Sequence, residues 1–327
     1  MRRVRDDEGG VIAVIVAISS IALMGMLALV IDVGALYEER RELQNGADAG
    51  ALAIAQRCAA ATLLSTCTAL EDGAEANTFA DANALDSASN VDDVDVVGTL
   101  IEGRVTVKTS TSDAGGSQIA YKVAQLLSKD NKGKTVHATA VAAWGAVGEI
   151  DSLPLTISDC LFDLMTSSGT VFGVERTLMF HDPNTEVPCA ASNNNQQAPG
   201  NWGWIDEPLK SPGNRCVVHL RRGGANGETG NDTECSNSQL SSLLGQEIAL
   251  PVYDQATGTG GNTEYRVVGF AGFVLTAYHL SPQVDSGNPC APPDTCIRGK
   301  FTRLVVSDGE LDPDADYFGV KTVQLIG

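Results

Sequence analysis

The stretch VIAVIVAISSIALMGMLALVI, residues 11–31, contains twenty-one residues and no charged side chain. A helix rises about 1.5 Å per residue, so this stretch covers about 30 Å, the thickness of the hydrocarbon core of a bilayer. The hydroxyls of Ser19 and Ser20 can bond to carbonyls of their own helix, so no backbone group is stranded in lipid. The sequence therefore predicts a transmembrane helix at residues 11–31.

Two other interpretations of this stretch compete with a membrane span. A cleavable signal peptide also begins with basic residues before an apolar run, but its core is only about 7–15 residues long. The pattern Val33-Gly34-Ala35 that follows the run is a poor cleavage site. A buried core helix would need protein on every side of an all-round apolar helix. The length of the run and the poor cleavage site therefore favour a retained membrane span.

The residues on either side of the span predict its orientation. Three arginines lie in residues 1–10, although three acidic residues accompany them, whereas residues 32–42 carry a mixture of both signs. Basic residues near a span tend to stay cytoplasmic. We therefore expect residues 1–10 to form a cytoplasmic tail and residues 32–327 to lie outside the cytoplasm, in a bacterial cell membrane protein that spans once.

The cysteines support export of this larger part. All of them follow the span, at Cys58, Cys67, Cys160, Cys189, Cys216, Cys235, Cys290 and Cys296. An even set of cysteines in an exported domain indicates disulfides. Cys58 and Cys67 are placed for a local bridge. The other six allow fifteen pairings, of which proximity favours 160 with 189, 216 with 235 and 290 with 296.

Composition limits the partners. The formal net charge of −19 argues against nucleic acid, because affinity for phosphate backbones depends on lysine and arginine. No small-molecule substrate is expected either. The residues beyond the span are numerous enough for one large or two ordinary domains.

The helix is predicted to continue past the membrane, from about residue 10 to 57. Apolar or small residues recur at spacings of three and four after position 32, as on one face of a helix. The candidates for close helix packing within this stripe are Gly46, Ala47, Gly50, Ala51 and Ala55. Packing on the protein's own globular part is favoured over a filament contact with another subunit.

The remaining chain predicts an α+β protein. Residues 32–150 are expected to form a helical stalk and a small unit, with strands near 94–97 and 105–107, a helix at 119–128 and a strand at 135–147. A second short helix and a loop are expected in 69–92. From residue 151 to 327, short apolar runs alternate with long loops rich in glycine, asparagine and proline, which is typical of a mostly β domain braced by disulfides.

Evidence for catalysis is scarce. The sequence contains no GxSxG, HExxH, Walker loop or dinucleotide-binding motif. His137, His219 and His279 lie in strand patterns that indicate structural roles, and His181 lies at a loop entrance where a turn is more common. We therefore predict that the protein is not an enzyme.

Alternating aspartates in DPDADY form one candidate metal site. Asp312, Asp314 and Asp316 could direct several oxygens at one calcium ion. An EF-hand is excluded, because Tyr317 stands where glycine is required and Val323 stands where glutamate is required. The missing ligands favour a solvated acidic turn instead, and no other cofactor is expected.

The N-terminal region resembles the TadE/TadG-like proteins of bacterial Flp (tight adherence) pilus assembly, over about residues 8–57. The matching positions are Glu8, Gly9, Asp32, Tyr37, Arg40, Arg41, Leu43, Gln44, Asn45, Ala47, Asp48, Ala49, Ala51, Leu52 and Ala53. Pilin-like members have a glutamate where this chain has Ile15, so the resemblance does not imply processing by a prepilin peptidase. The DxSxS metal motif of longer TadG proteins is also lacking, since Asp86-Ser87-Ala88-Ser89 has different spacing.

Together these observations predict a non-enzymatic, membrane-anchored component of pilus assembly or anchoring that contacts pilins or other assembly proteins. One alternative is a surface adhesin or a minor pilin, whose loops near 193–204 and 308–316 would bind glycan or calcium. In that case Trp202 and Trp204 would stack on sugar rings. A second alternative is an exported hydrolase with an unrecognised acidic pair.

Overall fold

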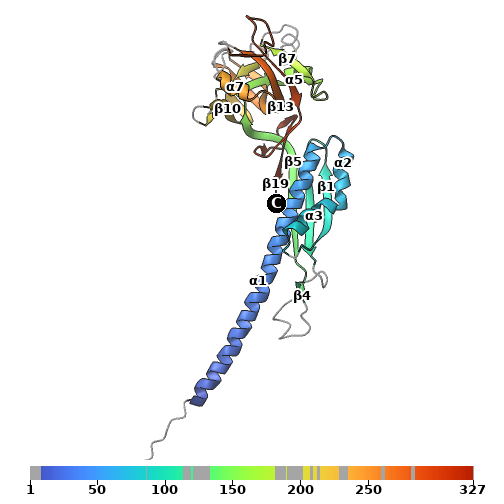
Figure 1. Cartoon of the computed structure of the whole chain (residues 1–327), viewed down its shortest axis with the longest axis vertical. Coiled ribbons are helices and arrows are strands. Elements are labelled where there is room, and N and C mark those ends of the chain that lie inside the picture. Colours follow the sequence, from blue (N-terminus) through green and yellow to red (C-terminus); the bar gives the residue numbers. More distant parts are fainter. Residues whose placement is uncertain are drawn as a thin grey trace, which may run out of the picture.

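The structure is a computed structural model that describes residues 9–85, 87–112, 119–120, 133–180, 189, 202–206, 209–211, 214–227, 235–258, 262–280 and 284–326. Figure 1 shows an elongated molecule with a long bare helix at one end and a globular β domain at the other. A smaller unit lies between them, against the upper part of the helix. We call this unit the stalk unit (residues 37–146 and 320–326) and the globular end the β domain (residues 147–319).

Helix α1 spans Gly9–Ala60 without interruption, a length of roughly 80 Å at the rise of an α-helix. The long helix predicted from residue 10 to 57 is therefore confirmed. Of the predicted tail at residues 1–10, residues 1–8 lie outside the described part of the chain.

The other elements are short, apart from a few long strands. The helices are α2 (Leu64–Thr68), the 3-10 helix η1 (Ala69–Asp72), α3 (Ala74–Asn83), α5 (Asp159–Thr166) and α7 (Asn237–Ser242). The first strands are β1 (Ser89–Gly98), β2 (Gly103–Thr111), β3 (Ile119–Ala120), β4 (Gly133–Lys134), β5 (His137–Ser152), β6 (Leu155–Ser158), β7 (Glu175–Met179), β8 (Trp202–Trp204), β9 (Leu209–Ser211) and β10 (Asn214–Arg221). The others are β11 (Gly223–Asn226), β12 (Glu247–Thr257), β13 (Glu264–Leu280), β14 (Val284–Ser286), β15 (Cys296–Thr302), β16 (Leu304–Val306), β17 (Glu310–Leu311), β18 (Asp316–Phe318) and β19 (Val320–Leu325).

The stalk unit is a sheet with helices on one face. Its strands run in the order β1, β2, β5 and β19, β16 of the β domain pairs with the free side of β19, and α1 and α3 pack together against the sheet. Side chains of a strand alternate between faces. Val105 and Val107 of β2 are buried with Ala140 and Trp144 of β5, whereas Arg104 points away from this core. Small and branched residues alternate in these strands, which is why the strands could be predicted from the sequence.

One predicted helix of this unit differs from the structure. Residues 119–128 were expected to be helical, but Ile119–Ala120 form strand β3, paired with β4. Residues 121–128 lie outside the described part of the chain. Local periodicity gave the wrong structure at residues 119–120, because pairing with β4 comes from another part of the sequence.

Strand β5 joins the stalk unit to the β domain. It runs from His137 to Ser152 and pairs first with β2 and β19, and then with β10 through its last four residues. It therefore crosses the boundary expected near residue 150. The C-terminal strand β19 leaves the β domain and returns beside β5 in the stalk unit (Figure 1).

The β domain is built around the 17-residue strand β13, which pairs with β12 and β15 along its length. The resulting sheet has the order β7, β15, β13, β12, β6 and β8. Its core contains edge-to-face aromatic pairs, such as Phe162 with Phe301 at 5.2 Å between ring centroids. Burial of such rings contributes much of the stability of a core. The prediction of a mixed α+β chain with a mostly β, disulfide-braced domain is confirmed.

Candidate membrane anchor and its junction with the β domain

The lower part of α1 presents apolar side chains to its surroundings. Ile21 and Met24 are 72% and 71% exposed, and most of their neighbours in residues 12–33 are similarly bare. By length and composition, this is the one helix in the described chain that is apolar enough to cross a membrane. An exposed apolar surface of this extent marks a contact with lipid or with another protein. The span predicted at residues 11–31 therefore coincides with the bare segment.

Above the bare segment, α1 packs on the protein's own stalk unit. A Cβ atom added at Gly46 would lie 2.9 Å from Cα of Ala80, and one added at Gly50 would lie 3.2 Å from Cα of Ala76. Both alanines belong to α3, so the two glycines allow the backbones of α1 and α3 to approach closely. The other predicted packing residues, Ala47, Ala51 and Ala55, are fully buried in the same core. Close packing within the chain therefore accounts for these five residues of the stripe.

The upper end of α1 is fixed by three contacts of different kinds. Cys58 forms a disulfide with Cys67. The Nε atom of Arg57 lies 2.9 Å from Oε1 of Glu75. The Nζ atom of Lys321, on β19, donates to the carbonyl of Ala59 at 2.7 Å. Carbonyls in the last turn of a helix lack helical partners and carry partial negative charge, so an amino group is a favourable cap there.

Comparison with protein families identifies the same helix. Residues 10–61 match the family described as putative Flp pilus-assembly TadE/G-like. The resemblance stated from the N-terminal residues is confirmed, and we call residues 10–61 the Tad segment. Searches of curated proteins and of solved structures found no match.

The Tad segment ends where α1 ends, so its boundary coincides with a structural one. Lys321 lies beside this boundary, only 3% exposed, and it also donates to the carbonyl of Leu100. Burial lowers the pKa of its ammonium from 10.5 to about 8, with a further contribution from the charge of Arg303. This contact could not be predicted from local patterns, because Lys321 and Ala59 are 262 residues apart.

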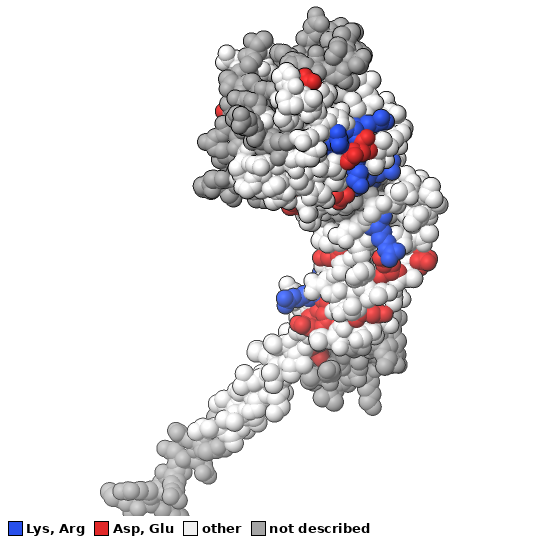
Figure 2. Space-filling view, turned by 45° about the horizontal axis from the view of Figure 1, so that its top comes forward, with Lys and Arg blue, Asp and Glu red and all other residues white. Residues whose placement is uncertain are grey.

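Ion pairs lie at the end of strand β5, where the β domain begins. The Nε atom of Arg222 donates to Oδ2 of Asp312 at 2.7 Å, where β17 and the loop after it meet β5. Arg221 binds Glu149 of β5, and this hydrogen bond lowers the pKa of the Glu149 carboxyl. Figure 2 shows basic and acidic groups side by side on the lower part of the β domain. These pairs lie on the surface next to the junction between the stalk unit and the β domain.

The candidate calcium residues lie in this same region. Burial raises the pKa of Asp312, the hydrogen bond from Arg222 lowers it, and the net shift is downward. The backbone N–H of Asp314 also donates to Oδ1 of Asp312, at 2.9 Å, and Nη2 of Arg222 lies 3.9 Å from Oδ2 of Asp314. Asp316 is exposed in β18. Arg222 therefore supplies the positive charge beside Asp312, and the described residues contain no group of three or more potential ligands arranged for a metal ion.

The tryptophans proposed to stack on sugars lie elsewhere. Trp202 and Trp204 are 0% and 2% exposed in the β-domain core, with their rings edge to face. Nε1 of Trp202 donates to the carbonyl of Leu178. The expectation that these rings bind glycan is wrong, because no face of either ring is open to a ligand.

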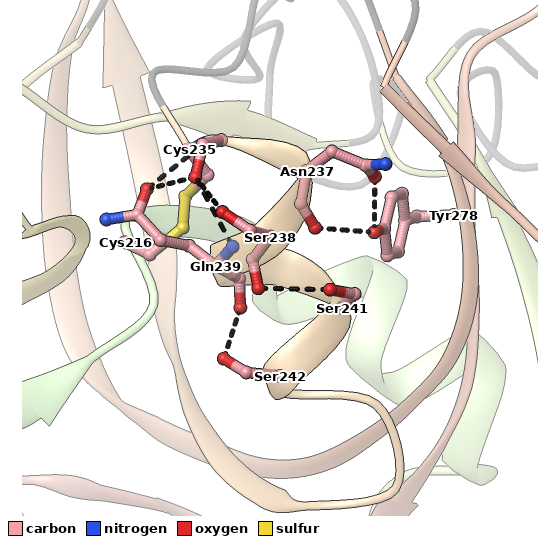
Figure 3. The surroundings of a disulfide bond; sticks show 9 residues. Cys216, Cys235, Asn237, Ser238, Gln239, Ser241, Ser242 and Tyr278 are labelled. Carbon is pink, nitrogen blue, oxygen red and sulfur yellow. Dashed lines mark hydrogen bonds between the residues drawn. A yellow bond between two sulfur atoms is a disulfide. The ribbon is translucent and has the colours of Figure 1, made fainter.

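Each cysteine pairs with its neighbour along the chain. The bridges are Cys58–Cys67, Cys160–Cys189, Cys216–Cys235 and Cys290–Cys296. Figure 3 shows that Cys216–Cys235 ties β10 to the start of α7. There Ser236 and Gln239 form a capping box, and the hydroxyl of Tyr278 donates to Oδ1 of Asn237 at 2.7 Å. The bridge and the cap together fix this short helix, which is too short to be stable alone.

The three histidines of the described residues do not converge on one another. His219 is exposed, and its two ring nitrogens face the carboxylates of Asp151 and Glu149. Nδ1 of His137 lies 3.4 Å from Oδ2 of Asp92. His181 lies outside the described residues. The strand positions predicted for His137 and His219 are correct, but the acidic neighbours of His219 come from β5 and could not be read from the pattern around it.

Proposed function

We propose that this chain is a membrane-anchored component of Flp-type pilus assembly or anchoring that acts through protein contacts of its globular part and not by catalysis. The match of the Tad segment to a pilus-assembly family carries this proposal. The structure supports it because the matched segment is one helix that combines a bare apolar half with a half packed inside the stalk unit.

The anchoring role follows from the physical chemistry of the bare segment. A helix of apolar residues with about 30 Å of exposed length is stable in lipid and would aggregate in water. With residues 1–10 in the cytoplasm, the stalk unit and β domain would lie outside it, where disulfides form. In this orientation the β domain faces the pilins or the other assembly proteins.

Filament subunits provide the main competing role. A subunit would need a free helix face for packing into the filament, and the small-residue stripe from Gly46 to Ala55 is already covered by α3 and the sheet. This observation counts against the stripe as a filament contact and leaves the bare segment at residues 12–33 as the surface that would meet either lipid or neighbouring subunits. The adhesin alternative has lost its stacking residues, since Trp202 and Trp204 are buried.

Fractionation tests the proposal directly. Filaments are sheared from cells that produce the full-length chain, and the filament and carbonate-washed membrane fractions are probed for it. We expect the protein only in the washed membrane, at full length. Recovery in purified filaments would contradict the proposal and indicate a minor pilin. Orientation is tested separately with alkaline phosphatase fusions, which we expect to be active at the C-terminus and inactive at the N-terminus.

A further inference from the structure

A basic and aromatic face lies on α1 immediately above the bare segment. Tyr37, Arg40, Arg41 and Gln44 are spaced three and four residues apart, so they share one side of the helix. They line one recess together with Asn45. Tyr37 is 75% exposed, and both arginines are exposed. Figure 2 shows basic side chains where the bare helix meets the stalk unit.

The acidic residues of this segment lie on the other side. Glu38, Glu39 and Glu42 follow a separate row around the helix. Oε2 of Glu42 accepts from the backbone N–H of Leu85 at 3.0 Å, so this carboxylate is directed at the stalk unit. Within the described chain, no ion pair is formed by Arg40 or Arg41. The two guanidinium groups therefore present a net positive surface at this height, because Asp48, which lies on the same row and accepts from Nε2 of Gln44 at 2.8 Å, is about 10 Å further up the helix than Arg41.

The height of this surface matches the lipid headgroups. If the hydrocarbon layer ends at Ile31, the Cα atom of Arg40 lies about 14 Å above it, beyond the headgroup layer, so the side chain must extend down the helix to reach the phosphates. If the layer ends at Leu36, Arg40 lies about 6 Å above it. The headgroup layer is about 5–7 Å thick on each side. Side chains on a helix tilt toward its N-terminus, which here points into the membrane, and arginines near the ends of a span extend toward the interface.

We propose that Tyr37, Arg40 and Arg41 bind the phosphate groups of anionic phospholipids in the leaflet beneath the stalk unit. Guanidinium groups bind phosphate through paired hydrogen bonds, and tyrosine is favoured at headgroup depth because its ring is apolar and its hydroxyl is polar. Such binding would fix the depth and rotation of α1 in the bilayer. This inference rests on the proposed function only in that it requires α1 to cross the membrane.

Spin-labelled lipids measure this binding. The full-length protein is reconstituted into phosphatidylcholine vesicles containing spin-labelled phosphatidylglycerol or spin-labelled phosphatidylcholine, and the motionally restricted fraction is compared. We expect a preference for phosphatidylglycerol of roughly fivefold per arginine at low salt, decreasing as salt is added. The variant Arg40→Gln/Arg41→Gln should lose the preference. The charge-matched variant Arg104→Gln/Arg176→Gln, with both changes away from the helix, should retain it.

The outcomes separate the two proposals. Incorporation of the protein with no preference for phosphatidylglycerol, or a preference that Arg40→Gln/Arg41→Gln retains, would overturn the lipid site and leave the anchor intact. An unchanged lipid preference with loss of piliation in that variant would assign the arginines to a protein contact, which also overturns it. Failure of the wild-type chain to resist carbonate extraction from the vesicles would overturn the membrane anchor and the lipid site together.

Discussion

The ammonium group of Lys321 donates to the carbonyl of Ala59 at 2.7 Å, so the last strand of the chain caps the helix that begins it. The same group donates to Leu100 in the turn between β1 and β2. One buried side chain thus joins α1, the edge of the sheet and β19. Neither carbonyl has another hydrogen-bond donor among the described residues, so their pairing depends on this lysine.

Replacing Lys321 by methionine should destabilise the stalk unit. The substitution keeps much of the side-chain volume but leaves the carbonyls of Ala59 and Leu100 without a donor. A buried acceptor left unpaired costs about 1–3 kcal/mol, so we expect the free energy of unfolding to decrease by about that amount near pH 9, where the lysine is largely neutral in the folded state and its desolvation penalty no longer offsets the loss. Urea unfolding of the detergent-solubilised full-length protein measures this. Lys108→Met, at an exposed pair with Asp93, should change it much less, because water screens this pair. Equal effects of the two substitutions would contradict the role of Lys321.

The pKa of Lys321 makes stability depend on pH. Its folded-state pKa is lowered from 10.5 to about 8, so between these values the unfolded chain binds more protons than the folded chain. Stability contributed by this group therefore increases as pH rises through this window, by at most about 1.4 kcal/mol per pH unit. We expect the wild type to gain stability relative to Lys321→Met between pH 8 and 10.5. Parallel pH profiles of the two proteins would show that the charged form is not penalised.

Two glycines of α1 should respond in opposite ways to the same substitution. Gly46→Ala places a methyl group 2.9 Å from the backbone of Ala80, so α3 must move and overpacking should cost about 1–3 kcal/mol. Gly34→Ala meets no atom within 4 Å, and alanine favours a helix by up to about 1 kcal/mol. The melting temperature should decrease for the first and stay equal or increase for the second. A neutral Gly46→Ala would mean that α1 and α3 are packed less closely.

Calcium should have little effect on this protein. Arg222 already neutralises Asp312, so a calcium ion would have to displace a guanidinium group to use that carboxylate. We expect the melting temperature to be the same with millimolar calcium and with a chelator. A rise that Asp314→Ala abolishes would restore the predicted calcium site.

The sequence predicted the elements whose signal is local. The span of α1 follows from an uncharged run, and the strands β1, β2 and β5 follow from alternating valines and small residues. The pairing of neighbouring cysteines also agrees with short loops closing most readily. In each case, the residues that form the element are close together in the chain.

The contacts that hold the molecule together were not predictable in this way. Lys321 and Arg222 look like ordinary strand charges in the sequence, and only the return of β19 beside β5 brings Lys321 to Ala59. Trp202 and Trp204 stand in a loop-like stretch rich in glycine, which made them look exposed. Their burial follows from pairing of β8 with β6, a strand more than forty residues earlier. Tertiary pairing decided each of these sites.

Strand β5 has a mechanical consequence. It continues without a break from the stalk unit into the β domain, and β19 lies antiparallel to it over Lys321–Leu325. A pull on the β domain away from the bilayer would act along the covalent backbone of β5. The cross-strand hydrogen bonds to β19 lie perpendicular to the strands, so the same pull would load them together in shear. The molecule is therefore suited to bear tension between a membrane and whatever its β domain holds.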